Sequence, residues 1–326
     1  MASLVGSKAL LDSALKVRVR QIKKILRTEQ CDAVITCTGD LFDPPAAFIA
    51  SKELGIPLIL YSFDYYSFQG DDPVLRSFAQ AYEQDLLRAA QVIVPNECMR
   101  KEYRDHYGID TTIIHNPFDI GEYENLARKA GEENYSGIPE KTIVYTGAIY
   151  DAHYDAFRNL IAAIPLSGNN PVRLHLYTPQ SPYRLVENNI TGPGVEVHKA
   201  QPASAIPAIQ QKADILFLPL SFDPQLREII RTSAPGKMGE YLASKKPVLV
   251  HAPKDSFVSR YFKKYNCGLV VDKNSPEQLA RAIERLLHDT DLCREITQNA
   301  YERAKNDFDI NAARKKLFTL IDGVWE

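Results

Sequence analysis

The segment 232–244 combines residue types that can bind a phosphate and sugar hydroxyls. Pro235 is typical of the first turn of a helix, and Ser233 just before it is the predicted cap. Backbone N–H groups at this helix start, around Pro235 and Gly236, can bind a phosphate together with the Lys237 ammonium group. Glu240 lies one helical turn further on, where its carboxylate can accept hydrogen bonds from ribose or sugar hydroxyls. A capped surface helix with an exposed Lys and Glu would have the same spacing, so both interpretations stay open.

A second group of candidates follows two predicted strands in the first third of the chain. Asp64 comes two residues after the strand predicted at 57–62 and can bind an acceptor hydroxyl or help to deprotonate it. Gly39 and Asp40 follow an earlier strand, and Tyr65 can contribute to an aromatic wall of the kind that sugars favour. The alternatives are structural: Asp64 can cap the next segment, and aromatic residues in loops commonly serve packing.

These residues must be positioned by an alternation of short β-branched runs and helical patterns, which is typical of parallel sheets covered on both faces. A charged segment with Gly131, Gly137 and Pro139 separates two series of strands and predicts a linker. The first series opens on a long helix at 10–27 instead of a strand, so we expect its opening strand–helix units to be missing. The predicted strands lie at 32–37, 57–62, 91–94 and 111–114, and then at 142–146, 172–177, 195–198, 214–218, 247–251 and 268–271.

Composition and charge exclude several function classes. The 326-residue chain has 39 Lys and Arg against 41 Asp and Glu, a net charge of −2, so no global basic field exists to bind nucleic acid. Its longest apolar stretches are far short of the roughly 20 residues that span a bilayer. The 5 cysteines are scattered and no His stands at metal-ligand spacing, so we expect no metal site and no cofactor.

Several segments resemble the GT-B glycosyltransferases of group 1, family 4. In the second half, the sequences ADILFLP at 213–219 and SAPGKMGEYLASKKPVL at 233–249 are similar to the block that binds the sugar donor in that family. IVYTGAI at 143–149 resembles the family's first donor-domain strand and glycine turn. Before the linker, AQVIVPN at 90–96 resembles the rear part of its acceptor domain.

The resemblance implies an α/β fold of the GT-B type, with two Rossmann-like parallel-sheet domains that face a cleft and a truncated N-terminal domain. An acceptor-side domain is expected at 1–120 and a linker at 121–140. A domain that binds the nucleotide-sugar donor is expected at 141–307. A C-terminal helix at 308–326 could pack back on the N-terminal domain.

The resemblance also assigns roles to single residues. Glu240 matches the second Glu of the family's E-x7-E motif and would hold the donor ribose, so Glu240 and Asp64 are the catalytic candidates. The first Glu of that motif, which contacts the transferred sugar, falls at Thr232. The sequence therefore departs from the family at the sugar contact.

A second departure concerns the donor phosphates. Many family members place an Arg and a Lys after the glycine turn, but neither follows Gly147 in this chain. The phosphate charge would then be met by Lys237 and the helix start, with His153 and Arg231 as helpers. Donor binding is accordingly expected at Gly147, His153, Arg231, Thr232, Ser233, Pro235, Gly236, Lys237 and Glu240, and acceptor binding at Gly39, Asp40, Asp64 and Tyr65.

The implied function is transfer of a sugar from a nucleotide-diphosphate sugar to a hydroxyl acceptor, with retention of configuration and without a metal. The acceptor would be a saccharide, a lipid-linked molecule or a small molecule. Because of the two departures, a noncatalytic GT-B subunit that needs a partner chain is the alternative, and a nucleotide-sugar epimerase is a third interpretation.

The cellular location is predicted from the first residues of the chain and from its first helix. The first residues show no signal peptide, because polar residues interrupt the apolar ones, so we expect a cytoplasmic protein. The helix at 10–27 is basic and amphipathic, which suits either packing on a sheet or peripheral contact with an anionic membrane. A homo-oligomer is a further possibility, since an incomplete first sheet would leave an edge open.

Overall fold

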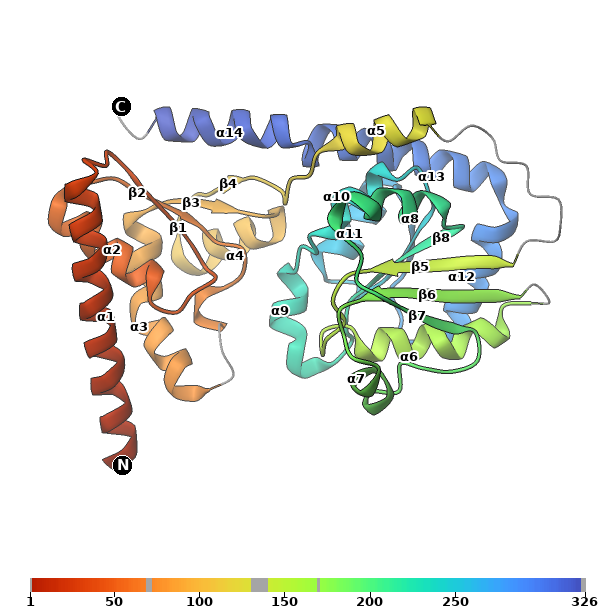
Figure 1. The fold of residues 1–326 in the computed structure, drawn as a ribbon, viewed down its shortest axis with the longest axis horizontal. Coiled ribbons are helices and arrows are strands. Elements are labelled where there is room, and N and C mark those ends of the chain that lie inside the picture. Colours follow the sequence, from red (N-terminus) through yellow and green to blue (C-terminus); the bar gives the residue numbers. More distant parts are fainter. Residues whose placement is uncertain (1, 69–71, 130–139, 169–170, 324–326) are drawn as a thin grey trace. The chain divides into compact units, whose positions relative to one another are not determined.

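Residues 2–68, 72–129, 140–168 and 171–323 are described in the computed structural model of the chain, which divides into two units. The first unit comprises Met1–His115 and Lys316–Glu326, and the second comprises Asn116–Lys315. Each unit contains one parallel sheet with helices packed on it (Figure 1).

The first unit has a four-stranded sheet in the order β1-β2-β3-β4, with every neighbouring pair parallel. The inner strands are apolar and buried, since Leu60 and Ile93 are fully enclosed. Asp72 caps α3 by accepting hydrogen bonds from two backbone N–H groups, and Gly55 ends α2 in the left-handed conformation at φ 68°. Its elements are α1 (Ala2–Thr28), β1 (Val34–Cys37), α2 (Asp43–Leu54), β2 (Leu58–Tyr61), η1 (Tyr66–Phe68), α3 (Pro73–Ala89), β3 (Gln91–Val94), α4 (Glu97–Tyr107) and β4 (Thr112–Ile113).

The second unit has a six-stranded parallel sheet in the order β10-β9-β8-β5-β6-β7. Its strands are β5 (Lys141–Thr146), β6 (Val172–Thr178), β7 (Val195–Lys199), β8 (Ile215–Pro219), β9 (Val248–His251) and β10 (Leu269–Val271). Its helices are α5 (Ile120–Lys129), α6 (Tyr154–Ala163), η2 (Ile164–Leu166), α7 (Pro182–Glu187), η3 (Ala203–Ala205), α8 (Ile206–Lys212), η4 (Pro224–Leu226), α9 (Arg227–Thr232), α10 (Lys237–Ala243), α11 (Phe257–Tyr265), α12 (Pro276–His288), α13 (Thr290–Arg303) and the π-helical turn η5 (Ala304–Phe308). The last helix, α14 (Ile310–Asp322), begins in this unit and ends in the first.

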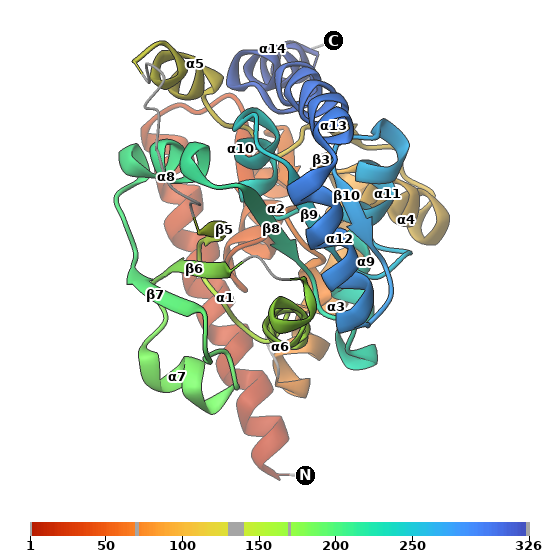
Figure 2. The ribbon, with the colours of Figure 1, turned by 90° about the vertical axis from the view of Figure 1, so that its right-hand side faces the viewer.

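The core of the second unit lies between its sheet and the helices α6 and α12. Leu174 and Phe217 from the sheet pack with Phe157 of α6 and Ile283 of α12, all fully buried. Figure 2 shows these helices on one side of the sheet. Such a buried parallel sheet explains the apolar runs that predicted its strands.

The order of strands places a switch point at the centre of this sheet. β5 comes first in the unit and lies between β6 and β8, so Ile143 pairs with Leu174 on one side and Ile215 on the other. The connections after β5 and after β8 therefore leave in opposite directions. Ligands of open α/β sheets bind in the crevice that this reversal creates at the carboxyl ends of the strands.

The expected strands are confirmed, because all ten strands of the described residues lie within two residues of their predicted bounds. The unit boundary lies between His115 and Asn116, earlier than the domain end expected at 120. The reason is a bridge to the end of the second unit: Phe118 donates its N–H to Phe308 O and accepts from Ile310 N, both at 3.0 Å. The expected linker at 121–140 contains most of α5, and 130–139 lie outside the described residues.

In the described part of the chain, no helix combines the length and the apolar character that crossing a bilayer requires.

Candidate functional site

Lys237 is the first residue of α10, and the start of this helix differs from the sequence prediction. Gly236 is the residue before it, and no side chain caps the helix, so the prediction that Ser233 caps it is wrong. Ser233 instead closes the preceding helix α9, into which its backbone N–H donates. The new helix then begins with a turn in which Met238 N donates to Pro235 O at 2.9 Å.

The Lys237 side chain lies against the end of the central strand β5. Gly147, directly after β5, has φ +127° and donates its N–H to Tyr177 O at 2.9 Å. A Cβ built on Gly147 would lie 3.0 Å from Lys237 Cε and 3.4 Å from Nζ. Lys237 Nζ also lies 4.7 Å from the centre of the Tyr145 ring. The glycine thus leaves the space that the lysine needs at the switch point of the sheet.

The electrostatics around Lys237 favour an anion. Burial lowers the pKa of Lys237 to about 8, and the nearby Glu240 carboxylate opposes that shift. Burial and the lysine charge lower the pKa of His153 to about 3, so its imidazole is neutral at physiological pH. His153 is 3% exposed, and its Nδ1 has no hydrogen-bond partner among the described residues. The site therefore holds one partly desolvated cation beside a neutral ring.

Glu240 lies three residues after Lys237, on the same side of α10. Its Oε2 accepts a hydrogen bond of 3.1 Å from Gln210 Nε2, which also donates to Thr146 Oγ1 at 3.0 Å. Gln210 Oε1 in turn accepts from the Tyr123 hydroxyl at 2.7 Å. Burial raises the pKa of Glu240, while the Gln210 hydrogen bond and Lys237 lower it. The network fixes one carboxylate oxygen and leaves Oε1 without a hydrogen-bond donor among the described residues.

A cavity of 870 Å³ adjoins this site at the carboxyl ends of β8 and β9. Ser221, on its wall, donates its N–H at 2.7 Å to the carbonyl of Ala152, the neighbour of His153. Arg227, Lys254 and Arg260 also line it, so its wall is rich in cations. Lys237 and Glu240 are not among the residues that line this cavity.

The comparisons with known proteins bear on this geometry. A family model described as glycosyl transferases group 1 matches residues 140–289, and one described as glycosyltransferase family 4 matches residues 11–122. The chain belongs to the group 1 glycosyltransferases. The match at 140–289 contains Gly147, His153, Lys237 and Glu240, which we call the Lys237 site, and also Gln210, but not Tyr123.

Solved structures agree with the fold of this glycosyltransferase, which is GT-B. A glycosyltransferase from Rickettsia africae ESF-5 has a TM-score of 0.70 at 14% identity, over 96% of this chain and 82% of that one. HepE from Anabaena, in complex with UDP, has a TM-score of 0.67 at 17% identity, over 94% and 82%. Sucrose-phosphate synthase from Thermosynechococcus elongatus has a TM-score of 0.70 at 15% identity, over 94% and 77%. No curated protein matches the sequence.

Two further predicted donor residues of the glycosyltransferase lie at the end of α9. Thr232, which occupies the position of the missing motif glutamate, is 4% exposed. Arg231 pairs with Glu228 of the same helix at 3.0 Å. The structure therefore brings Gly147, His153, Lys237 and Glu240 around one point, whereas Arg231 is engaged by a neighbouring carboxylate.

The predicted acceptor residues of the glycosyltransferase belong to the first unit. Asp64 is exposed, and its backbone N–H and that of Phe63 donate to Thr38 Oγ1 at 3.4 and 2.9 Å. Asp40 accepts from the N–H groups at the start of α2, and Gly39 beside it is exposed. Tyr65 is buried at 8% exposure in the core of this unit, where its ring packs against Tyr103. Its role in the structure is packing.

Sequence reasoning missed the residues that orient the site. Gln210 on α8 and Tyr123 on α5 hold Glu240 in place, yet neither belongs to a motif. Tyr145 belongs to the strand predicted at 142–146, directly before the glycine turn. That position was the one sequence signal that could have identified it as a residue of the site.

Proposed function

We propose that the glycosyltransferase moves a sugar from a nucleotide-diphosphate sugar to a hydroxyl acceptor, with retention of configuration and without a metal ion. One observation carries the proposal: Lys237 is held over Gly147 at the switch point of the second sheet, with Glu240 one turn further along the same helix. A cation and a carboxylate at this spacing suit the diphosphate and the ribose hydroxyls of a nucleotide diphosphate.

The Lys237 ammonium would bind the diphosphate. It is partly desolvated, so its interaction with a phosphate is stronger than that of an exposed lysine. Gly147 has no side chain, which allows a phosphate to approach the backbone at the end of β5. As the glycosidic bond breaks, negative charge grows on the leaving diphosphate, and Lys237 would stabilise it. This is the role that a divalent metal fills in other transferases, and it supports the metal-independent mechanism.

The Glu240 carboxylate would accept hydrogen bonds from the ribose hydroxyls. Gln210 holds Oε2 and so directs the carboxylate, while Oε1 is available to a ligand. HepE, which shares the fold, was solved in complex with UDP and with UDP-glucose, and these complexes support a nucleotide-sugar donor. Retention is supported by the resemblance of the donor block to family 4.

Asp64 is the proposed acceptor-side residue, because it is exposed and its backbone is fixed by Thr38. An Asp64→Asn variant should lower kcat while leaving the affinity for the donor nucleotide unchanged. The control is Asp85→Asn, which changes an exposed carboxylate on α3. Equal loss of activity in both variants would contradict a specific role for Asp64.

A lipid-linked acceptor would place the protein at a membrane surface, and α1 has the character for peripheral contact. Leu10, Val17 and Ile25 are exposed on this helix, and Lys16, Arg20 and Lys24 are exposed with them. Apolar side chains flanked by cations suit an anionic lipid surface. Co-sedimentation with vesicles of phosphatidylglycerol, set against neutral phosphatidylcholine vesicles, tests this part of the proposal.

The donor site is tested by calorimetric titration with UDP, GDP and ADP in the presence of EDTA. We expect one of these nucleotides to bind without metal and Glu240→Ala to weaken it at least tenfold. Glu302→Ala, which removes an exposed carboxylate from α13, is the matched control. A folded wild-type chain that binds none of the three would contradict the proposal.

A further inference from the structure

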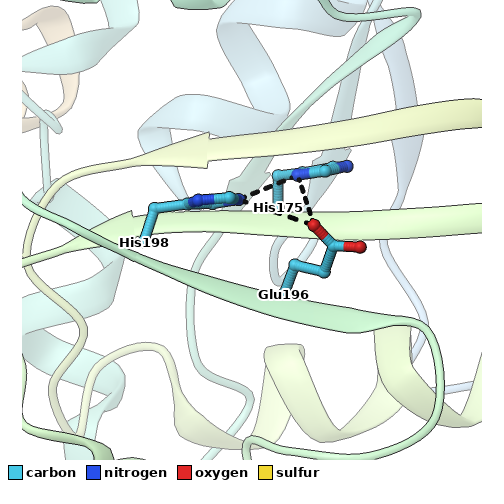
Figure 3. A group of neighbouring side chains, drawn as sticks. All are labelled: His175, Glu196 and His198. Carbon is cyan, nitrogen blue, oxygen red and sulfur yellow. Dashed lines mark hydrogen bonds and ion pairs between the residues drawn. The ribbon is translucent and has the colours of Figure 1, made fainter.

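Three metal-binding side chains meet on the outer strands of the second sheet. His175 lies on β6, and Glu196 and His198 lie on the edge strand β7. In the parallel register His175 pairs with Glu196, and Tyr177 pairs with His198. Residues two apart on a strand face the same side, so the three side chains share one face of the sheet. Figure 3 shows both imidazole rings and the carboxylate turned toward one another.

The ligand atoms are close enough to share one ion. His175 Nδ1 lies 2.9 Å from His198 Nε2 and 3.5 Å from Glu196 Oε2, and His198 Nε2 lies 3.9 Å from the same oxygen. Ligand atoms at about 2.0–2.1 Å from a tetrahedral zinc ion are roughly 3.3 Å apart. The three observed separations lie on both sides of that value, so a shift of a few tenths of an ångström would complete the geometry.

Neighbouring side chains already orient the three ligands. Arg173, on the same face of β6, pairs with Glu196 Oε1 at 3.2 Å, which turns Oε2 toward the histidines. The Tyr177 ring stacks on the His198 ring at 4.4 Å with an angle of 14° between the planes. Partners of this kind fix ligand orientation in metal sites. The three ligands are partly buried, which leaves an ion access from solvent.

We infer that His175, Glu196 and His198 form a binding site for a zinc-like divalent transition-metal ion. Two imidazoles and one carboxylate suit zinc, nickel or copper, whereas magnesium and calcium require a set of oxygen ligands. Three protein ligands leave at least one coordination position for water. The bound ion would join the edge strand β7 to β6. This site shares no residue with the Lys237 site, the group of Gly147, His153, Lys237 and Glu240, and it does not depend on the proposed function.

The sequence did not predict this site, because its ligands come from two strands. His175 and Glu196, which pair across the sheet, stand 21 positions apart in the chain. The expectation of no metal ligands rested on short-range spacing. Among the described residues, this is the group of three or more candidate ligands whose atoms all lie within 4.8 Å of one another.

The test is a titration of the metal-free full-length chain with zinc chloride, in competition with a chromophoric chelator. We expect one equivalent to bind with micromolar or tighter affinity, and at least a tenfold loss in His198→Ala and in Glu196→Gln. His288→Ala, a histidine variant on α12, should bind zinc like the wild type. The melting temperature should rise with zinc in the wild type and not in His198→Ala, because an ion that binds only the folded state stabilises it.

A histidine pair that shares a hydrogen bond would also explain the 2.9 Å separation. In that case zinc would bind weakly, or with equal affinity to the wild type and all three variants, and either result would overturn the inference. Should a cluster variant fail to fold, a zinc-edge anomalous map of soaked wild-type crystals gives the answer. A peak among the three side chains supports the site, and no peak there rejects it.

Discussion

Gly147 and Lys237 share one small volume at the end of β5: a Cβ on the glycine would lie 3.0 Å from Lys237 Cε. The glycine also has φ +127°, a backbone conformation that residues with a Cβ rarely adopt. Backbone geometry and side-chain placement thus depend on each other at this position. The proposed diphosphate site exists because the chain has no side chain where the lysine must lie.

Gly147→Ala should therefore lower the free energy of unfolding by about 1–3 kcal/mol and weaken nucleotide binding, because the added methyl displaces Lys237. Gly236→Ala is the matched control, since no atom lies within 4 Å of its Cβ position and its φ is −55°. Chemical denaturation of both variants checks the prediction. Equal free energies of unfolding of Gly147→Ala and Gly236→Ala would show that the close approach to Lys237 does not affect stability.

Lys237→Met should weaken binding of the nucleotide diphosphate by about 10- to 100-fold, the effect of losing a charged hydrogen bond. Nucleotide affinity of the wild type should also fall as the pH rises through about 8, where the buried lysine loses its proton. Calorimetry at pH 7 and pH 9 measures both effects. Lys212→Met, at an exposed position, is the control.

The Lys237→Met substitution should also change how the stability of the protein depends on pH. The pKa of Lys237 is lowered from 10.5 to about 8 in the folded chain, so the unfolded chain binds more protons between these values. The contribution of Lys237 to the free energy of unfolding of the wild type should consequently increase as the pH rises from 8 to 10.5. Lys237→Met should lack that increase, so its stability relative to the wild type should fall as the pH rises from 8 to 10.5. Parallel stability curves of the two proteins over this pH range would contradict the lowered pKa.

His153 should contribute a loss of stability in acid. Its pKa is lowered from 6.5 to about 3 by burial, so the unfolded chain takes up the proton first as the pH falls. The resulting penalty is absent above pH 6.5 and grows as the pH falls toward 3. His153→Phe should therefore lose less stability than the wild type between pH 7 and pH 5 in denaturation experiments. His288→Phe, at an exposed position of α12, is the matched control.

Gln210→Leu should destabilise the second unit by about 1–3 kcal/mol, since the Tyr123 hydroxyl would lose its acceptor. The pKa of Glu240 should rise further, because the Gln210 hydrogen bond is one of the interactions that lower it. Nucleotide affinity should then fall at mildly acidic pH, where the carboxyl begins to take up a proton. Gln225→Leu, at an exposed site, provides the comparison, and identical pH profiles would rule out this role for Gln210.

The sequence by itself determined the strands and the pairing of Lys237 with Glu240. Strands of a buried parallel sheet are continuous apolar runs, a local signal that needs no tertiary information. Residues three apart on a helix share a face, so the position of Glu240 relative to Lys237 followed from spacing alone. The resemblance to group 1 glycosyltransferases rested on the same local segments.

Tertiary structure alone decided which residues surround that pair. Gln210 reaches Glu240 across 30 residues of sequence, and His175 reaches His198 across two strands. It also placed Tyr65 in a core and made Ser233 the end of α9 instead of the cap of α10. Burial and long-range hydrogen bonds depend on how elements pack, and no pattern within a single segment contains that information.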